Sequence, residues 1–115
     1  MNHENKTINI YLAGPMSGRE DYNYQAFLET AENINAIARN RGKNVHVVHT
    51  ANAPREMDYG IYLGISYFFL AKSDAIVFME GWEKSMGSNW ERERAMELGV
   101  PEFFIRNGSC KELLS

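Results

Sequence analysis

Short apolar runs alternate with helical segments along nearly the whole of this 115-residue chain. The runs are rich in β-branched and aromatic residues, as expected of strands that are buried on both faces. They occupy residues 7–13, 45–48, 74–79 and 102–106. Between and after them, helical spacing or composition predicts helices over residues 21–41, 58–72 and 92–99. This alternation predicts an α/β fold, a single-domain Rossmann-like (flavodoxin-like) parallel sheet with helices on both faces.

The composition supports one domain over residues 1–115. Hydrophobic residues make up 44% of the chain and charged residues 23%, which is ordinary for a globular protein. A chain of this length builds one core rather than two. Residues 1–6 are polar and are expected to be loosely held, and residues 111–114 are expected to add a last helical turn.

Charge and hydropathy exclude several functions. The net charge of −3 gives no electrostatic footprint for a nucleic-acid polymer. No apolar run is long enough to cross a bilayer, and the N-terminus lacks the apolar core of a signal peptide. Cys110 is the single cysteine, so no internal disulfide forms and a cytoplasmic location is expected. His46 and His49 have no further ligand at a useful spacing, and we expect neither a metal ion nor another cofactor.

Two glycine-containing loops follow predicted strands. Residues 14–18 (Gly-Pro-Met-Ser-Gly) follow the first strand, and residues 81–91 follow the third. In parallel sheets ligands bind beyond the carboxyl ends of the strands, so both loops are expected at one ligand-binding edge. The first loop matches neither the dinucleotide fingerprint nor a phosphate loop with a Walker lysine, and a plain tight turn also explains it.

Glu91 is the charged residue of most interest, because we expect it in or near the first turn of the helix over residues 92–99. A carboxylate at that place is favoured by the helix dipole and would stay ionised. It is either a nucleophile or part of a solvated face, since three charged residues follow it directly. Ser85 has two interpretations as well, as the cap of this helix or as a ligand of an anion.

The predicted second helix is strongly aromatic, with Tyr59, Tyr62, Tyr67, Phe68 and Phe69. It offers more apolar surface than one face of a small sheet needs. Core packing is one explanation. The other is a subunit interface, a kind of surface in which tyrosine and phenylalanine are enriched.

Two signatures in a fixed order suggest a family. The first runs from Ile10 to Gly18 and is followed by Tyr22, Asn23 and Phe27. The second consists of residues 74–77, then residues 81–87 and Glu91. Together they resemble the nucleoside 2-deoxyribosyltransferase superfamily, and in particular its small branch of phages and bacteria. The likeness spans most of the chain, and it implies the host cytoplasm as the location if a phage encodes the protein.

The resemblance also implies roles for individual residues. The 2'-deoxynucleoside 5'-phosphate N-hydrolases of this superfamily have a similar spacing, matched here by Ser85, Gly87 and Glu91. By this likeness Glu91 attacks the anomeric carbon, displaces the base and forms a glycosyl ester, which water or a second base resolves. Tyr11 would orient the nucleophile, although it could equally pack in the core. Ser85 and the backbone amides of Gly87 and Ser88 would hold a 5'-phosphate.

Further candidates for substrate binding come from both loops and from the second helix. They are Gly14, Met16, Ser17, Gly18, Ser66 and Trp82. Trp82 and Trp90 either stack on a base or pack the loops together, and packing is slightly favoured.

One position departs from the family's pattern. In the family an acidic residue on the second helix, eight positions before the aspartate that corresponds to Asp74, assists departure of the base. Here that position is Ser66, whose hydroxyl cannot replace a carboxylic acid as a proton donor. Asp58 lies about two helical turns earlier and is a poor substitute. If the helix aims position 66 into the cleft, Ser66→Asp is expected to raise the rate of base release.

Two functions therefore stay open. The first is cleavage of the N-glycosidic bond of a nucleoside or nucleotide, or transfer of its deoxyribosyl group. The second is a non-catalytic protein on the same fold that sequesters or senses a nucleotide. A purely structural subunit is disfavoured by the two ligand-type loops. The expected partners are a nucleoside or nucleotide and further copies of this chain, in a homodimer or higher homo-oligomer.

Overall fold

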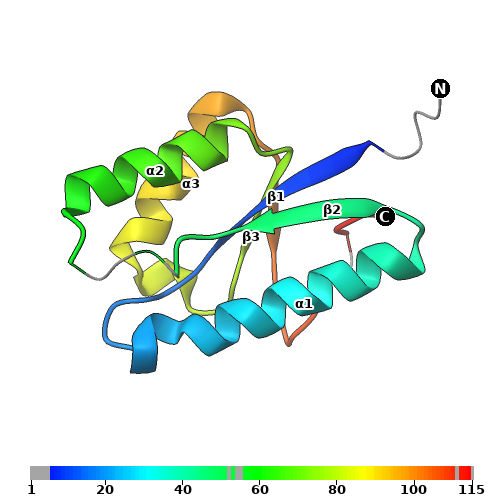
Figure 1. Ribbon diagram of the computed structural model, residues 1–115, viewed down its shortest axis with the longest axis horizontal. Coiled ribbons are helices and arrows are strands. Elements are labelled where there is room, and N and C mark those ends of the chain that lie inside the picture. Colours follow the sequence, from blue (N-terminus) through cyan, green and yellow to red (C-terminus); the bar gives the residue numbers. More distant parts are fainter. Residues whose placement is uncertain (1–5, 52, 54–55, 111, 115) are drawn as a thin grey trace.

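The computed structural model describes residues 6–51, 53, 56–110 and 112–114. Within them the chain forms a four-stranded parallel sheet and three α-helices (Figure 1). In chain order the elements are β1 (Thr7–Ala13), α1 (Tyr24–Asn40), β2 (Asn44–Val48), α2 (Tyr59–Ala71), β3 (Ala75–Phe78), α3 (Met86–Leu98) and β4 (Glu102–Phe104). The strands lie in the order β2-β1-β3-β4, which confirms the predicted Rossmann-like, flavodoxin-like architecture. The expectation of a loose N-terminus concerns residues 1–5, which lie outside the described residues, and Lys6.

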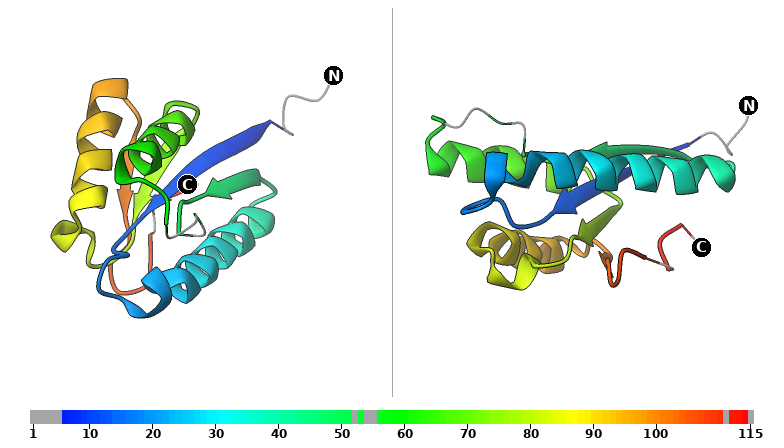
Figure 2. Two further views of the ribbon diagram at one scale, coloured as in Figure 1. Left: turned by 60° about the vertical axis from the view of Figure 1, so that its left-hand side comes forward. Right: turned by 90° about the horizontal axis from the view of Figure 1, so that it is seen from below.

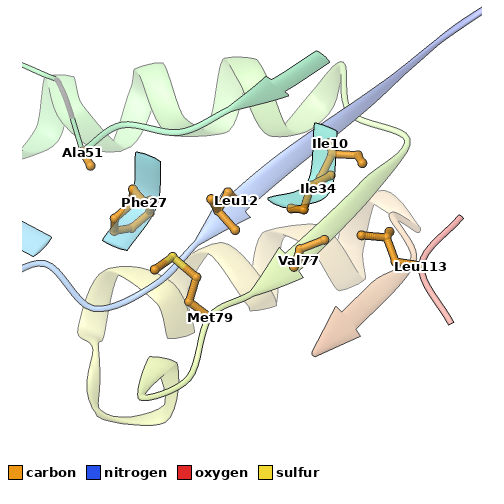
Figure 3. Close-up of a cluster of buried hydrophobic side chains, with 8 residues drawn as sticks. All are labelled: Ile10, Leu12, Phe27, Ile34, Ala51, Val77, Met79 and Leu113. Atoms are coloured by element: carbon orange, nitrogen blue, oxygen red, sulfur yellow. The ribbon is translucent and has the colours of Figure 1, made fainter. Parts of the chain in front are cut away.

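The first face of the sheet is covered by α1. Ile10 and Leu12 of β1 point to this face, as does Val77 of β3. They pack with Phe27 and Ile34 of α1 in a continuous apolar cluster (Figure 3). Burial of each such side chain is worth about 1.5–3 kcal/mol relative to an exposed one. This cluster fixes the angle at which α1 crosses the sheet.

The second face is covered by α2 and α3, which lie side by side (Figures 1 and 2). Tyr11 and Ala13 of β1 point to this face because successive side chains of a strand alternate. They pack with Leu70 of α2 and Ala95 of α3. β1 is thus buried on both faces and on both edges, since it pairs with β2 and β3.

The strand order reverses between β1 and β3. From β1 the chain first runs through α1 to β2 at one edge, and then crosses back through α2 to β3 on the other side of β1. Loops that leave the carboxyl ends of β1 and β3 therefore diverge over opposite faces, which opens a crevice between them. Gly14 leaves β1 close to this crevice, where a Cβ would lie only 2.9 Å from Sδ of Met79.

The boundaries of two helices differ from the expected ones. α1 begins at Tyr24 rather than at residue 21, because Asp21, Tyr22 and Asn23 have positive φ angles of 49°, 53° and 64°. A right-handed helix cannot include such residues. α3 begins at Met86 rather than near residue 92.

The C-terminal part is also shorter in regular structure than expected. β4 ends at Phe104, and Arg106 instead pairs with Ser109 across a turn. Residues 112–114 form a turn rather than a helical turn, and position 111 lies outside the described residues.

The outer side of α2 is apolar and exposed. Ile61 and Phe68 are 58% and 54% exposed, and they follow one stripe of the helix together with Gly64 and Tyr67. This side is not part of the core of one chain. Among the described residues no helix is both long and apolar enough to cross a membrane. A second copy of this chain remains the partner that we predict for the stripe.

We therefore expect a homodimer or larger homo-oligomer in solution, held by the α2 stripe. Sedimentation at tens of micromolar should give a mass above that of the 13.2-kDa chain. Ile61→Glu combined with Phe68→Glu should shift the protein to monomer, because burying two unpaired charges in an interface is costly. Asn40→Glu on the exposed end of α1 is the matched control. A wild-type monomer at this concentration would contradict the prediction.

Candidate functional site

A cavity of about 600 Å³ lies beyond the carboxyl ends of the strands, where the strand order reverses. The loop after β1 and the first turn of α3 form two of its walls, and the start of α2 and Thr50, in the loop after β2, contribute to others. Its volume is that of a pocket for a small molecule or cofactor. Both glycine-containing loops therefore meet at one cavity, as the parallel arrangement predicts.

Three polar side chains meet beneath this cavity, one from each of three elements. Tyr11 comes from β1, Ser66 from the middle of α2 and Glu91 from the second turn of α3. All three are buried, with Glu91 only 5% exposed. The Tyr11 hydroxyl lies 2.5 Å from Oε2 of Glu91 and 2.6 Å from Oγ of Ser66. Ser66 also donates to Oε2 of Glu91. We call these residues the Tyr-Ser-Glu trio.

Burial decides the ionisation of Glu91. It raises the pKa of this carboxyl from 4.5 to about 7, and the hydrogen bonds from Ser66 and Tyr11 oppose the rise only in part. Glu91 lies in the second turn of α3, near the first turn as expected, but burial leaves its carboxyl partly protonated near neutral pH instead of simply ionised. The pKa of Tyr11 is raised well above 10.0, first by burial and then by the nearby Glu91. Tyr11 consequently keeps its proton and acts as a hydrogen-bond donor.

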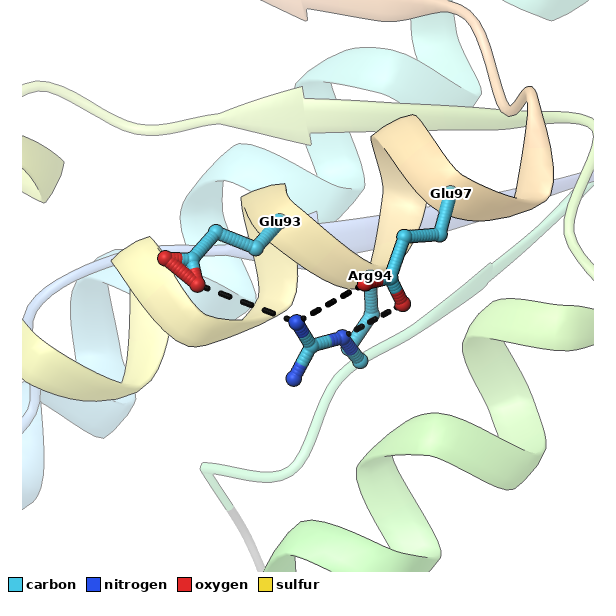
Figure 4. A network of polar contacts seen from close by, with 3 residues as sticks. All are labelled: Glu93, Arg94 and Glu97. Atoms are coloured by element: carbon cyan, nitrogen blue, oxygen red, sulfur yellow. Dashed lines mark hydrogen bonds and ion pairs between the residues drawn. The ribbon is translucent and has the colours of Figure 1, made fainter.

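The solvated-face interpretation fails for Glu91 but holds for its neighbours. Arg94 pairs with Glu97 at 2.9 Å and approaches Glu93 at 3.7 Å on the outer side of α3 (Figure 4). Arg92 pairs with Glu102 at 2.7 Å. Glu91 instead points toward β1 and α2, so the charges that follow it in sequence belong to other sides of the same helix.

Ser85 caps α3. Its Oγ accepts a hydrogen bond from the backbone N–H of Ser88 at 3.1 Å, which is the N-cap interaction. The N–H of Ser88 is therefore engaged within the helix and is not free for a phosphate. Among the described residues, the amides of Met86 and Gly87 have no backbone acceptor and remain available at the positive end of α3.

The cavity unites most of the predicted site residues. Its lining includes Gly14, Met16, Ser17, Ser85, Gly87, Ser88 and Glu91. Tyr11 and Ser66 contact Glu91 from beneath and are not part of the lining. Gly18 and Trp82 are not part of it either. Trp82 packs against Phe78 and Phe104 at ring-centroid distances of 4.9 and 5.6 Å, which agrees with the packing interpretation.

Ser88 combines burial with an unused hydroxyl. It is 1% exposed, and its Oγ has no hydrogen-bond partner among the described residues.

Several cavity residues carry no motif in the sequence. Arg19 and Lys84 bring two cations, and no carboxylate among the described residues pairs with either. A Cβ on Gly81 would lie 3.1 Å from Nη2 of Arg19, so this side chain reaches from the loop after β1 to the loop after β3. Thr50 and Tyr62 add hydroxyls to the lining. The sequence did not indicate that these four residues line one cavity, because each comes from a different segment of the chain.

Asp58 is occupied elsewhere. Its Oδ1 accepts hydrogen bonds from the amides of Gly60 at 2.8 Å and Ile61 at 3.4 Å, and so caps α2. It precedes Ser66 by about two helical turns and is engaged as a cap, which agrees with the expectation that it is a poor substitute for a catalytic acid. Among the described residues no group of three or more histidine, cysteine, aspartate and glutamate side chains could hold a metal ion.

A family profile described as "Domain of unknown function (DUF4406)" matches residues 8–103. The chain belongs to the DUF4406 family. The match includes the Tyr-Ser-Glu trio and both loops of the cavity. No curated protein and no solved structure matches the chain.

In this DUF4406 chain the buried Glu91 should make stability fall as the pH rises. Its folded pKa of about 7 exceeds the ordinary 4.5, so between these values the folded state binds more protons than the unfolded state. The free energy of unfolding is then highest below pH 4.5 and decreases by about 3 kcal/mol up to pH 7. Glu91→Gln should remove this dependence and stabilise the protein at pH 8 in urea unfolding. The control is Glu97→Gln, an exposed change on the same helix. Equal pH profiles for wild type and Glu91→Gln would contradict burial of the charge.

Ser66 should act on Glu91 rather than on a ligand. The structure does not aim Ser66 into the cavity, so the condition under which Ser66→Asp would accelerate base release is not met. A carboxylate at position 66 would lie against Glu91 and raise the pKa of one of the two groups.

Ser66→Ala removes a hydrogen bond that lowers the pKa of Glu91, and should raise this pKa further above 7. Carbon-13 NMR titration of labelled glutamate checks this. The control is Ser73→Ala, at a position that follows the C-terminal end of α2. An unchanged or lower pKa would refute it.

Proposed function

We propose that this protein cleaves the N-glycosidic bond of a nucleoside or nucleotide, or transfers its deoxyribosyl group, with Glu91 as the nucleophile. One observation carries the proposal. A buried carboxyl adjoins a ligand-sized cavity, and two hydroxyl groups hold it by the same oxygen, Oε2. The proposal includes membership of the nucleoside 2-deoxyribosyltransferase superfamily, to which the two sequence signatures point.

The geometry of the trio suits nucleophilic attack. Tyr11 and Ser66 both bind Oε2, so Oε1 is the oxygen that neither hydroxyl holds. With a pKa of about 7, Glu91 is ionised in a substantial fraction of molecules at neutral pH. Attack of the carboxylate on the anomeric carbon breaks the bond to the base and forms a glycosyl ester. Water, or a second base, then releases the sugar from the ester.

The cavity walls suit a ligand with one anionic end. Arg19 and Lys84 line a cavity whose sole lining carboxylate among the described residues is Glu91. The amides of Met86 and Gly87 at the start of α3 add hydrogen-bond donors and the positive end of the helix dipole. A 5'-phosphate is a group that these donors would bind. Tyr59 and Tyr62, whose rings are stacked at 6.1 Å, line another part of the wall and suit an aromatic base.

A second candidate is a nucleotide-binding protein without turnover. Ser66 favours it, because the acidic residue of the nucleoside 2-deoxyribosyltransferase superfamily is replaced here by a hydroxyl that is engaged with Glu91 and Tyr11. In that case the cavity sequesters or senses the nucleotide. A panel of nucleosides and nucleotides separates the two candidates, since thermal shift reports binding while chromatography reports free base.

Glu91→Gln is expected to abolish release of free base while binding persists. The amide is nearly isosteric with the carboxyl but cannot form the ester. Loss of the covalent route should lower the rate by several powers of ten, at about 1.4 kcal/mol of barrier for each. The measurement is the initial rate of base release from the panel, with Glu97→Gln as control. Ligand-induced thermal shift without base release in wild type would favour the binding protein, and equal rates in Glu91→Gln and wild type would exclude Glu91 as nucleophile.

A further inference from the structure

A second group of hydroxyls lines the cavity and has no part in the chemistry described so far. The hydroxyl of Tyr62 lies 2.5 Å from Oγ1 of Thr50 and 3.0 Å from Sδ of Met16. Tyr62 stands four residues, about one helical turn, before Ser66 on α2. Thr50 follows β2, and Met16 lies in the loop after β1. All three residues line the same cavity as Glu91.

The partners of Tyr62 leave its proton easy to transfer to a ligand. The Tyr62 hydroxyl donates to the thioether sulfur of Met16, which is a weak acceptor. Thr50 then donates to the oxygen of Tyr62, because that oxygen has already used its single proton. A nitrogen or oxygen atom of a bound base is a stronger acceptor than the sulfur. Such an atom can replace Met16 without leaving any strong hydrogen-bonding group unpaired.

The proposed reaction needs a donor of this kind. A base that leaves the sugar carries away the electron pair of the C–N bond and must be neutralised. Ser66 is engaged with Glu91 and Tyr11, and Asp58 is engaged with the first amides of α2. Tyr62 is on the same helix as both, and it faces the cavity.

We propose that Tyr62 is the catalytic residue that protonates the departing base, with Thr50 as its positioning residue. This inference rests on the proposed function. As Oε1 of Glu91 forms the ester, the C–N bond breaks, its electron pair goes to the base nitrogen and the base takes the proton of Tyr62. In the second step water attacks the anomeric carbon of the ester, the bond from this carbon to Oε1 breaks, and the water gives its proton to the Tyr62 phenolate. The free carboxylate, the sugar and the neutral phenol are then restored.

The pKa of Tyr62 sets its protonation before the first step and its strength as a base in the second. Burial raises its pKa to about 12, so it is protonated at neutral pH and its phenolate is a strong base toward water.

The test uses bases that differ in their need for a proton. Guanine must be neutralised on leaving, whereas N7-methylguanine is cationic in the nucleotide and leaves as a neutral molecule. Uracil and nicotinamide form the corresponding pair among single-ring bases. Each pair is compared on the same sugar and phosphate, with full-length wild type, Tyr62→Phe and Thr50→Val. Melting temperatures show which variants are folded.

Tyr62→Phe is expected to lower kcat by about 10²-fold or more on the nucleotides of guanine and uracil, the two bases that need a proton on leaving. Rates on N7-methylguanine and nicotinamide should be nearly unchanged. Thr50→Val should show the same dependence on the leaving group with a smaller factor. Tyr24→Phe is the control, since Tyr24 lies on α1 outside the cavity lining.

Three outcomes would overturn the role of Tyr62. Equal losses of rate on all four nucleotides, whether or not the base needs a proton on leaving, would indicate a purely structural contribution of the hydroxyl. Unchanged rates on guanine and uracil would mean that another group, from this chain or from a second copy, protonates the base. Both outcomes leave Glu91-dependent turnover intact, and with it the proposed function. Absence of any Glu91-dependent release from all four nucleotides would instead reject the proposed function and the role of Tyr62 together.

Discussion

The burial of one carboxyl group organises this structure. Oε2 of Glu91, Oγ of Ser66 and the hydroxyl of Tyr11 each lie within hydrogen-bond distance of the other two. When Glu91 is ionised, two protons serve these three contacts, and when it is protonated three protons serve them. The ionised form therefore leaves one contact without a proton. Because the protons of both hydroxyls go to Oε2, these hydrogen bonds still favour the ionised form and oppose in part the effect of burial, which raises the pKa of Glu91 to about 7.

The Tyr-Ser-Glu trio depends on the position of β1 between α1 on one face of the sheet and α2 and α3 on the other. Its odd-numbered core residue Tyr11 faces α2 and α3, while its neighbours Ile10 and Leu12 face α1. A shift of the strand by one residue would turn Tyr11 to the α1 face and separate it from Glu91. Pairing with β2 and β3 on both edges holds this register. The site thus depends on the packing of the central strand as much as on the loops.

Much of the fold could be predicted from the sequence, because the alternation of apolar runs and helical segments leaves few other arrangements. The edge of the sheet at which the cavity lies followed from the same pattern. The start of α3 could not be predicted, since Gly87, Ser88 and Asn89 form helices poorly and have no apolar periodicity. Only the cap by Ser85 shows that the helix begins there. This earlier start places Glu91 further into the helix than a start near residue 92 would.

The surroundings of Glu91 were hidden for a different reason. Its sequence neighbours are charged, and they do form a solvated face, but a helix presents successive residues to different sides. Contacts between distant segments carry no local signal at all. Arg19 and Lys84 approach the cavity from different loops, and Tyr62 meets Thr50 and Met16 only after three elements have packed. The proximity of such side chains can be recognised only from the folded structure.

Esterification would change the balance of forces at Glu91. The folded chain bears an energetic penalty for holding a charge away from water, as the raised pKa shows. A glycosyl ester at Oε1 is uncharged, so the penalty vanishes as soon as the covalent bond forms. The same burial that weakens the free protein at neutral pH would therefore favour the intermediate over the resting state. Release of the sugar would have to restore the buried charge, which makes the second step the more demanding half of the cycle.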